Sequence, residues 1–175
     1  IYAFELGRKK ELCFNELLSV LGKKNLIKQG LDTATFSLDL PFPQDLQNRL
    51  GGSIKIIEIF KETDLNGLQE SIQHRLETEF QDHEGKIPFA ISLLNFKNLR
   101  TINIKELLNF SKKILKSLGL NCRFVNKDFR SNPQSSTIYK ARIIEKGIDL
   151  NIIKEDEKIL IGKTIAIQDI DSYSI

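Results

Sequence analysis

Residues 2–22 read YAFELGRKKELCFNELLSVLG, in which two different hydrophobic patterns follow one another. The apolar run from Tyr2 to Leu6 predicts a short strand that ends at Gly7. From Cys13 onward, apolar residues recur at every third or fourth position until Gly22, which is the period of an amphipathic helix. A strand followed directly by a helix predicts a mixed α/β (α+β) chain.

The same alternation continues downstream. Residues 33–40, rich in Thr, Phe and Leu, predict a strand, and residues 44–50 predict a short helix that a Gly-Gly pair ends. The β-branched run over residues 54–59 predicts another strand. Whether residues 26–28 form a further strand is left undecided by the sequence. The order β-α-β-α-β predicts a ferredoxin-like domain over residues 1–62.

The second half is predicted to form another mixed α/β domain over residues 63–168, with residues 169–175 as the start of a linker. Its first helix is expected to begin at an N-cap formed by Thr63 or Asp64. Hydrophobic period and turn residues predict helices over residues 65–80, 104–118 and 135–146, and strands over residues 87–94, 121–125, 148–153 and 158–168.

Positive charge is concentrated in the fifty residues from Lys97 to Lys146. This segment holds twelve of the 26 basic residues and three of the 23 acidic ones, so its net charge is +9 while that of the rest is −6. A concentrated positive field attracts polyanions, which predicts nucleic acid as the partner. The alternative is a solvated lysine face, but the excess spans several predicted elements rather than one helix.

Composition places the chain among soluble globular proteins. No apolar run has the roughly 18 to 20 residues that a bilayer span needs, no secretory signal opens the chain, and a membrane partner is not expected. Cys13 and Cys122 have no metal-binding spacing and predict reduced thiols, hence a cytoplasmic location. Because the chain begins at Ile1 and contains no Met, we expect it to be a fragment of a longer protein.

Catalytic motifs are absent from the sequence. The two histidines, His74 and His83, match no zinc spacing, and no phosphate-binding glycine loop occurs. The four prolines are never adjacent, so the Asn/Asp-Pro-Pro-Tyr motif of amino methyltransferases is missing. We therefore predict no catalytic, cofactor-binding or metal-binding residue in this fragment.

Binding residues are easier to propose. On a helix over residues 104–118, three lysines fall within roughly 40° of one another, opposite the Leu/Ile stripe. Arg123 is expected on the next strand, and Lys127 and Arg130 in the loop after it. The predicted RNA-binding residues are Lys105, Lys112, Lys116, Arg123, Lys127, Arg130, Ser135, Ser136 and Lys140.

Two features of this region leave alternatives open. Ser135 and Ser136 lead into a predicted helix, where they either help to bind a phosphate or simply cap the helix N-terminus. Phe129, between Asp128 and Arg130, either stacks on an unpaired base or packs in the core. Such a mixture of residues is typical of backbone-dominated RNA recognition and contains no base code.

An ordered series of segments resembles one family. YAFELGRKKEL at residues 2–12, followed by Glu16-Leu-Leu, is similar to the opening of THUMP-containing RNA methyltransferases, in particular the archaeal-type tRNA guanosine N2-methyltransferases. The later segments that match in order are Arg123-Phe-Val, Ser135-Ser136, Lys146 to Leu150 and Ile161 to Asp169. Residues 170–174 resemble the linker that enters the methyltransferase domain of this family.

This resemblance implies a fold and a function. A ferredoxin-like domain over residues 1–62 and a THUMP-like domain over residues 63–168 would jointly hold tRNA, notably its single-stranded 3′ end. Methyl transfer from S-adenosylmethionine to a guanine amino group would then occur in a C-terminal domain joined in cis, beyond the linker at residues 169–175. No cofactor is expected in the fragment itself.

Two alternatives belong to other classes. The parent could instead be a DNA-modifying amino methyltransferase, or the fragment could be a structural and dimerisation domain with a merely solvated lysine face. A THUMP region can also accompany thiolation or pseudouridine chemistry, but the segment Gln168 to Ser174 favours methylation.

Overall fold

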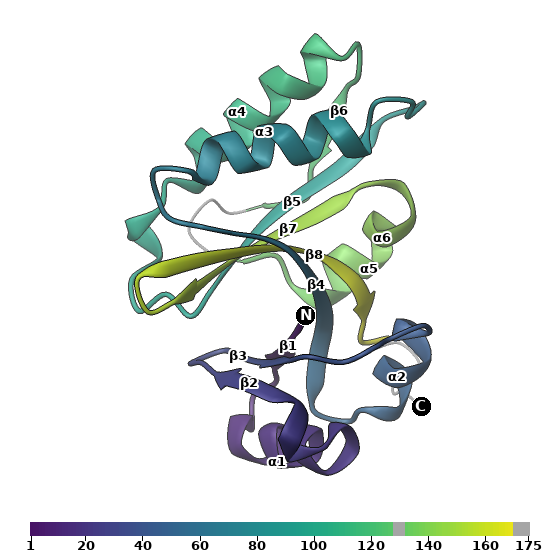
Figure 1. Ribbon diagram of the computed structural model, residues 1–175. Coiled ribbons are helices and arrows are strands. Elements are labelled where there is room, and N and C mark those ends of the chain that lie inside the picture. The colour runs from purple at the N-terminus through teal and green to yellow at the C-terminus, as the bar shows by residue number, and fades with distance from the viewer. Residues whose placement is uncertain (128–131, 170–175) are drawn as a thin grey trace.

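The computed structural model describes residues 1–127 and 132–169, which contain both strands and helices along their whole length (Figure 1). The elements are β1 (Tyr2–Leu6), α1 (Lys10–Leu21), the 3₁₀ helix η1 (Lys23–Asn25), β2 (Leu26–Gln29), β3 (Thr33–Phe36), α2 (Pro43–Arg49), β4 (Ser53–Thr63), α3 (Leu68–Glu79), β5 (Ile87–Leu94), the 3₁₀ helix η2 (Leu99–Thr101), α4 (Ile104–Ser117), β6 (Cys122–Phe124), α5 (Ser135–Lys140), α6 (Ile143–Lys146), β7 (Ile148–Glu155) and β8 (Lys158–Ile167). The predicted mixed α/β fold class is confirmed.

One continuous sheet contains all eight strands of the described residues, in the order β2-β3-β1-β4-β8-β7-β5-β6. The long strand β4 stands at its centre. It pairs antiparallel with β1 on one side and with β8 on the other, from Lys55↔Ile167 to Thr63↔Ile159. The sheet therefore runs without interruption through residue 62, where the sequence predicts a domain boundary; the division into two domains remains a prediction.

Glycine permits the close approach of β8 to β4. A Cβ atom on Gly162 would lie 2.5 Å from Ile57 Cγ2 and 2.7 Å from the backbone oxygen of Glu58. The register of the two strands shifts between Ile56 and Ile57 and again between Ile59 and Lys61. Such irregularities bend a strand and increase its twist, which lets one strand serve both halves of the sheet.

Three groups of helices cover the sheet. Helices α1 and α2 pack on the β1–β3–β4 side, where Phe4 and Phe36 meet edge to face with their ring centroids 5.7 Å apart. Helices α3 and α4 cover one face of β5, β7 and β8, while α5 and α6 cover the opposite face (Figure 1). Strand β5 is buried along its whole length because Phe89 faces the first pair of helices and Ala90 the second.

The predicted helix over residues 135–146 is wrong as a single element. Arg142 adopts a left-handed backbone with φ of 55°, and the chain forms the two short helices α5 and α6 on either side of it. On one straight helix Ile138 and Ile143, five positions apart, would point roughly 140° away from each other. The break allows both to pack against Ala90 and Ile167.

The start of the helix predicted over residues 65–80 also differs from the structure. Helix α3 begins at Leu68 because Thr63 is still paired with Ile159 in the sheet and cannot cap a helix. The Asp64 carboxylate instead accepts a hydrogen bond of 2.9 Å from the Gly67 N–H, which closes a turn before the helix. The further strand over residues 26–28, which the sequence alone left undecided, is present as β2.

A buried ionic cluster joins the two ends of the chain. The Lys55 ammonium on β4 lies 2.9 Å from an Asp149 carboxylate oxygen on β7 and 3.5 Å from Glu5 on β1. Ser92 and Thr164 donate hydrogen bonds of 3.0 and 2.6 Å to Asp149. Burial alone would lower the pKa of Lys55. The carboxylates of Asp149 and Glu5 together have the larger opposite effect, so the pKa of Lys55 is raised and the side chain stays charged.

Candidate nucleic-acid interface

Helix α4 exposes the lysines that its sequence pattern predicts. Its apolar side is buried against the sheet, while Lys105, Lys112 and Lys116 are exposed. The helix starts at Asn103, whose side chain accepts a hydrogen bond of 3.1 Å from the Glu106 N–H. Lys105 is eleven positions from Lys116, which at 1.5 Å per residue places it about 16 Å along the helix. The three lysines form a row rather than a single cluster.

A hollow lies at the C-terminal end of this row. It has a volume of about 520 Å³, and its lining residues are Gly85, Lys86, Lys112, Lys116, Gly119, Leu120, Asn121 and Cys122. We call it the lysine hollow. Three of these residues carry a positive charge, and none of the described lining residues is Asp or Glu. Lys86, from the loop before β5, lies outside the basic segment, so the charge count along the chain could not find it.

The charges of these lysines act on the thiol of Cys122, which also lines the hollow. Cys122, at the start of β6, is half-buried, and burial raises the pKa of its thiol. Lys112, Lys86 and Lys116 act in the opposite direction and lower the thiol pKa. The Lys112 ammonium also lies 6.0 Å from the centroid of the Phe124 ring, on the same strand.

Arg123 does not share this surface. Successive side chains of a strand point to opposite faces of the sheet. Cys122 and Phe124 face α4, so Arg123, which is exposed, points away from it. Lys127 is exposed beyond the end of β6. The predicted residue Arg130 and the loop residue Phe129 lie outside the described residues.

Two asparagine side chains take the place of a strand along the edge of β5. The Asn126 side chain accepts a hydrogen bond of 3.0 Å from the Ile91 N–H and donates one of 2.9 Å to the Ile91 carbonyl. The Asn132 side chain makes the same pair with Leu93, both at 2.7 Å. A primary amide offers one donor and one acceptor side by side, as a strand residue does. Residues 126 and 132 are thereby fixed to the sheet.

Ser135 and Ser136 lie at the start of α5, where neither acts as the N-cap. The N-cap is Gln134, and no side chain caps this helix. The prediction that one of these serines caps the helix is therefore wrong, because Ser135 is already the first residue of α5. Ser135 lines a second hollow, of about 740 Å³, which Arg8 and Lys9 in the turn after β1 also line.

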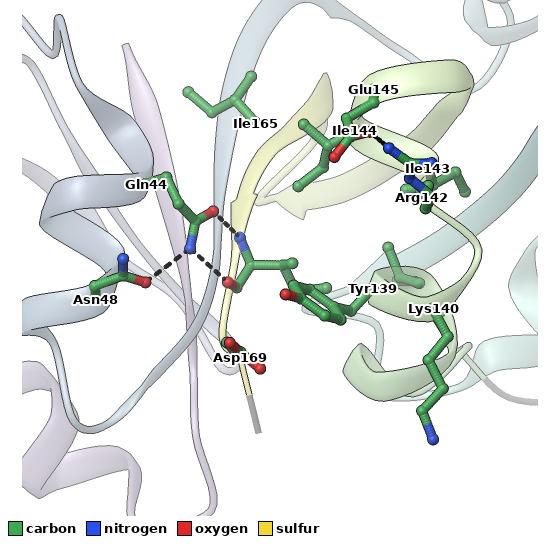
Figure 2. Close-up of a pocket in the computed structure, with 12 residues that line it drawn as sticks. Gln44, Asn48, Tyr139, Lys140, Arg142, Ile143, Ile144, Glu145, Ile165 and Asp169 are labelled. Carbon is green, nitrogen blue, oxygen red and sulfur yellow. Dashed lines mark hydrogen bonds and ion pairs between the residues drawn. The ribbon is translucent and has the colours of Figure 1, made fainter. Parts of the chain in front are cut away.

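Lys140 belongs to a third hollow, of about 630 Å³, between α2 and the α5–α6 pair (Figure 2). Its floor is apolar and includes Ile165 and Ile167 of β8. The Gln44 side chain donates a hydrogen bond of 3.0 Å to the Ile167 carbonyl and accepts one of 3.2 Å from the Ile167 N–H. It also donates to Asn48 at 2.9 Å, so this amide holds the end of β8 against α2.

The predicted binding residues thus occupy separate places. Lys112 and Lys116 line the lysine hollow, Ser135 lines the second hollow with Arg8 and Lys9, and Lys140 lines the third hollow beside α2. Over the described residues, no three or more His, Cys, Asp or Glu side chains gather into a possible metal site. In the same part of the chain, no helix combines the length and apolar character that a membrane crossing requires.

The fold is similar to those of several solved structures. These include TrmN from Thermus thermophilus (TM-score 0.56, 6% identity), PH1313 from Pyrococcus horikoshii Ot3 (0.52, 11%) and a possible methylase from Clostridium difficile 630 (0.52, 11%). The similarity covers 94%, 93% and 93% of this chain but only 45%, 53% and 40% of those chains. It supports a THUMP-like fold. No protein-family model and no curated protein matches the sequence.

Proposed function

We propose that this chain is the RNA-binding, tRNA-positioning module of an S-adenosylmethionine-dependent tRNA (guanine-N2) methyltransferase. The catalytic domain, with its cofactor, would follow in cis after the linker that starts over residues 169–175, and the protein would act in the cytoplasm. The module itself contributes binding and orientation, and the methyl transfer takes place elsewhere in the parent protein.

The observation that carries the proposal is the exposed lysine row of α4 with its acid-free hollow. Lys112, Lys116 and Lys86 present three positive charges on one concave surface. Phosphate contacts from lysines supply most of the affinity of sequence-independent RNA binding. A merely solvated lysine face would consist of the lysines of one helix. Here Lys86, from the loop before β5, lines the same hollow as Lys112 and Lys116 of α4.

The extent of the structural likeness supports the same assignment. Nearly the whole of this chain matches about half or less of each larger protein, one of which is described as a possible methylase. A chain that lacks a recognisable catalytic motif is what a positioning module of such an enzyme should be. The choice of guanine N2 and of the tRNA 3′ end comes from the sequence resemblance.

A titration with tRNA that carries or lacks its single-stranded 3′ end tests the proposal. We expect binding to weaken clearly when the end is removed. About five phosphate contacts give a log–log salt slope of roughly −3.5 for single strands, and up to about −4.5 for duplex. Lys112→Ala should reduce this slope by about one unit, whereas Lys24→Ala, an exposed lysine of η1, should leave it unchanged.

Other results point to different functions. If DNA of the same length is titrated in parallel and binds as tightly as tRNA, a DNA-modifying parent would be favoured. A slope near zero, or no binding, would contradict RNA recognition. Sedimentation of a stable dimer, together with a null titration, would then favour a structural and dimerisation role.

A further inference from the structure

Two turns contribute to the lining of the lysine hollow. Gly85 precedes β5 and Gly119 follows α4, and both have left-handed backbones, with φ of 93° and 78°. A Cβ atom on either glycine would meet nothing within 4 Å, so the rim of the hollow is open to solvent. A ligand can therefore approach without displacing protein atoms.

The lysines are not needed to stabilise the end of α4. The last carbonyl groups of this helix already accept hydrogen bonds from the backbone N–H groups of Leu118, Gly119 and Leu120. Within residues 1–127 and 132–169, none of Lys86, Lys112 and Lys116 forms an ion pair. Three like charges that line one hollow without an acid repel one another, and an anion bound among them would compensate this repulsion.

We propose that the lysine hollow binds one phosphate monoester, the 5′-terminal phosphate of the RNA that the module holds. This inference rests on the proposed function and makes it more specific. Lys86, Lys112 and Lys116 supply the donors, and Cys122 forms part of the floor.

The number of charges favours a terminal phosphate over an internal one. An internal phosphodiester carries one negative charge and two unesterified oxygens. A monoester carries about −1.5 to −2 charges at neutral pH and three such oxygens, which match three ammonium groups. Lysine suits this role because it acts as a compact point charge with donors that rotate freely. A concave site also admits a chain end more readily than a continuous backbone.

Cys122 provides a reporter inside the proposed site. A bound phosphate covers the thiol and cancels the positive charges that lower its pKa, and both effects slow alkylation. Cys13, the other cysteine, is only 2% exposed, so the two thiols differ in access. Mass spectrometry of the Cys122 peptide measures the rate of N-ethylmaleimide modification at this residue alone.

The experiment compares tRNA that retains its 5′-phosphate with the same tRNA after phosphatase treatment. We expect the phosphorylated form to bind about tenfold more tightly, the usual scale of a charged hydrogen-bonded contact, and to protect Cys122. In Lys86→Ala, which removes one of the three donors, the difference between the two forms should become smaller. Lys113→Ala, an exposed neighbour on α4 outside the hollow, should retain the difference.

The possible failures can be told apart. Equal protection of Cys122 by both forms would overturn the monoester assignment, because an internal phosphate would then occupy the hollow. Tight tRNA binding without protection would overturn the site and leave the proposed function intact. If no tRNA binds, the proposed function fails, and inorganic phosphate then tests whether the lysine hollow binds anions at all. Protection of Cys122 by millimolar phosphate in the wild type, lost in Lys86→Ala, would support an anion site. No protection of Cys122 by phosphate would contradict it.

Discussion

At the scale of single residues, Lys55 and Asp149 form a buried ion pair, which requires both partners to be present. Their side chains are 3% and 0% exposed and lie 94 positions apart in the sequence. A buried ion pair adds little net stability compared with an apolar pair, but removing one partner leaves an uncompensated charge. The pair therefore acts as a constraint that specifies how β4 and β7 meet across β8.

Asp149→Asn should destabilise the protein by about 3 kcal/mol, since Lys55 would lose its closest countercharge. Urea denaturation followed by circular dichroism measures the change in the free energy of unfolding. Adding Lys55→Met to Asp149→Asn removes the stranded charge and should restore part of the loss. Additive losses in the double variant would show that the two side chains are not coupled.

Glu5 predicts a dependence of stability on pH. Burial raises the pKa of this carboxyl above its ordinary value of 4.5, and the Lys55 ammonium offsets only part of the rise. A carboxyl whose pKa is raised by folding stabilises the fold below the unfolded pKa, and this contribution is lost as the pH rises through the folded pKa. Wild type should therefore lose stability relative to Glu5→Gln as the pH rises above about 4.5.

Urea denaturation of wild type and Glu5→Gln at pH 4.5 and pH 8 measures this difference. Glu11→Gln, at an exposed position of α1, serves as the control for a neutralised surface carboxylate. A constant difference between wild type and Glu5→Gln at the two pH values would contradict the assignment.

At the scale of elements, the edge of β5 shows how side chains replace a strand. Strand β6 pairs with β5 only from Ile87 to Phe89. Beyond that point Asn126 and Asn132 satisfy the backbone of Ile91 and Leu93. The two amides thereby attach Asn126, next to Lys127, and Asn132 to the edge of β5.

Asn126→Ala should leave the N–H and carbonyl groups of Ile91 without partners and cost about 2 kcal/mol. Hydrogen exchange of the Ile91 amide should speed up, while that of Leu93, held by Asn132, should change less. Asn109→Ala, at an exposed position of α4, is the matched control. Unchanged protection at Ile91 would show that water or another group replaces the side chain.

At the scale of the whole molecule, β4 and β8 connect the two predicted domains through one continuous sheet. Strand β4 borders the core formed with α1 and α2 and, through β8, the core formed with α3 and α4. Both cores should therefore lose their structure in a single cooperative transition.

Gly162→Val tests this continuity, because its side chain would collide with the Glu58 carbonyl and Ile57. We expect a loss of about 3 kcal/mol, since backbone atoms cannot move aside easily. Amide exchange at Phe4 and Phe89, which report on the two cores, should accelerate together. Loss of protection at one of them alone would favour two independent domains.

Hydrophobic period and turn residues were sufficient for most elements, because both act over a few positions of the chain. Strand β5 and the start of α4 coincide with their predicted residues, and β2 and α2 lie within one residue of theirs. The predicted element boundaries were wrong where a contact with a residue far away in the sequence determined the local structure. Thr63 stayed in a strand because β8 pairs with it, and residues 135–146 broke at Arg142 because two isoleucines had to reach one surface.

By itself the sequence determined the mixed α/β class, the basic segment and the exposed lysines of α4, since these depend on composition and local period. The tertiary structure brought Lys86 to Lys112 and Lys116, turned Arg123 to the other face and joined Lys55 to Asp149. Those arrangements depend on which strands pair and in which register, and pairing is set by the burial of the whole sheet. No short stretch of sequence contains that information, because the residues that meet are far apart along the chain.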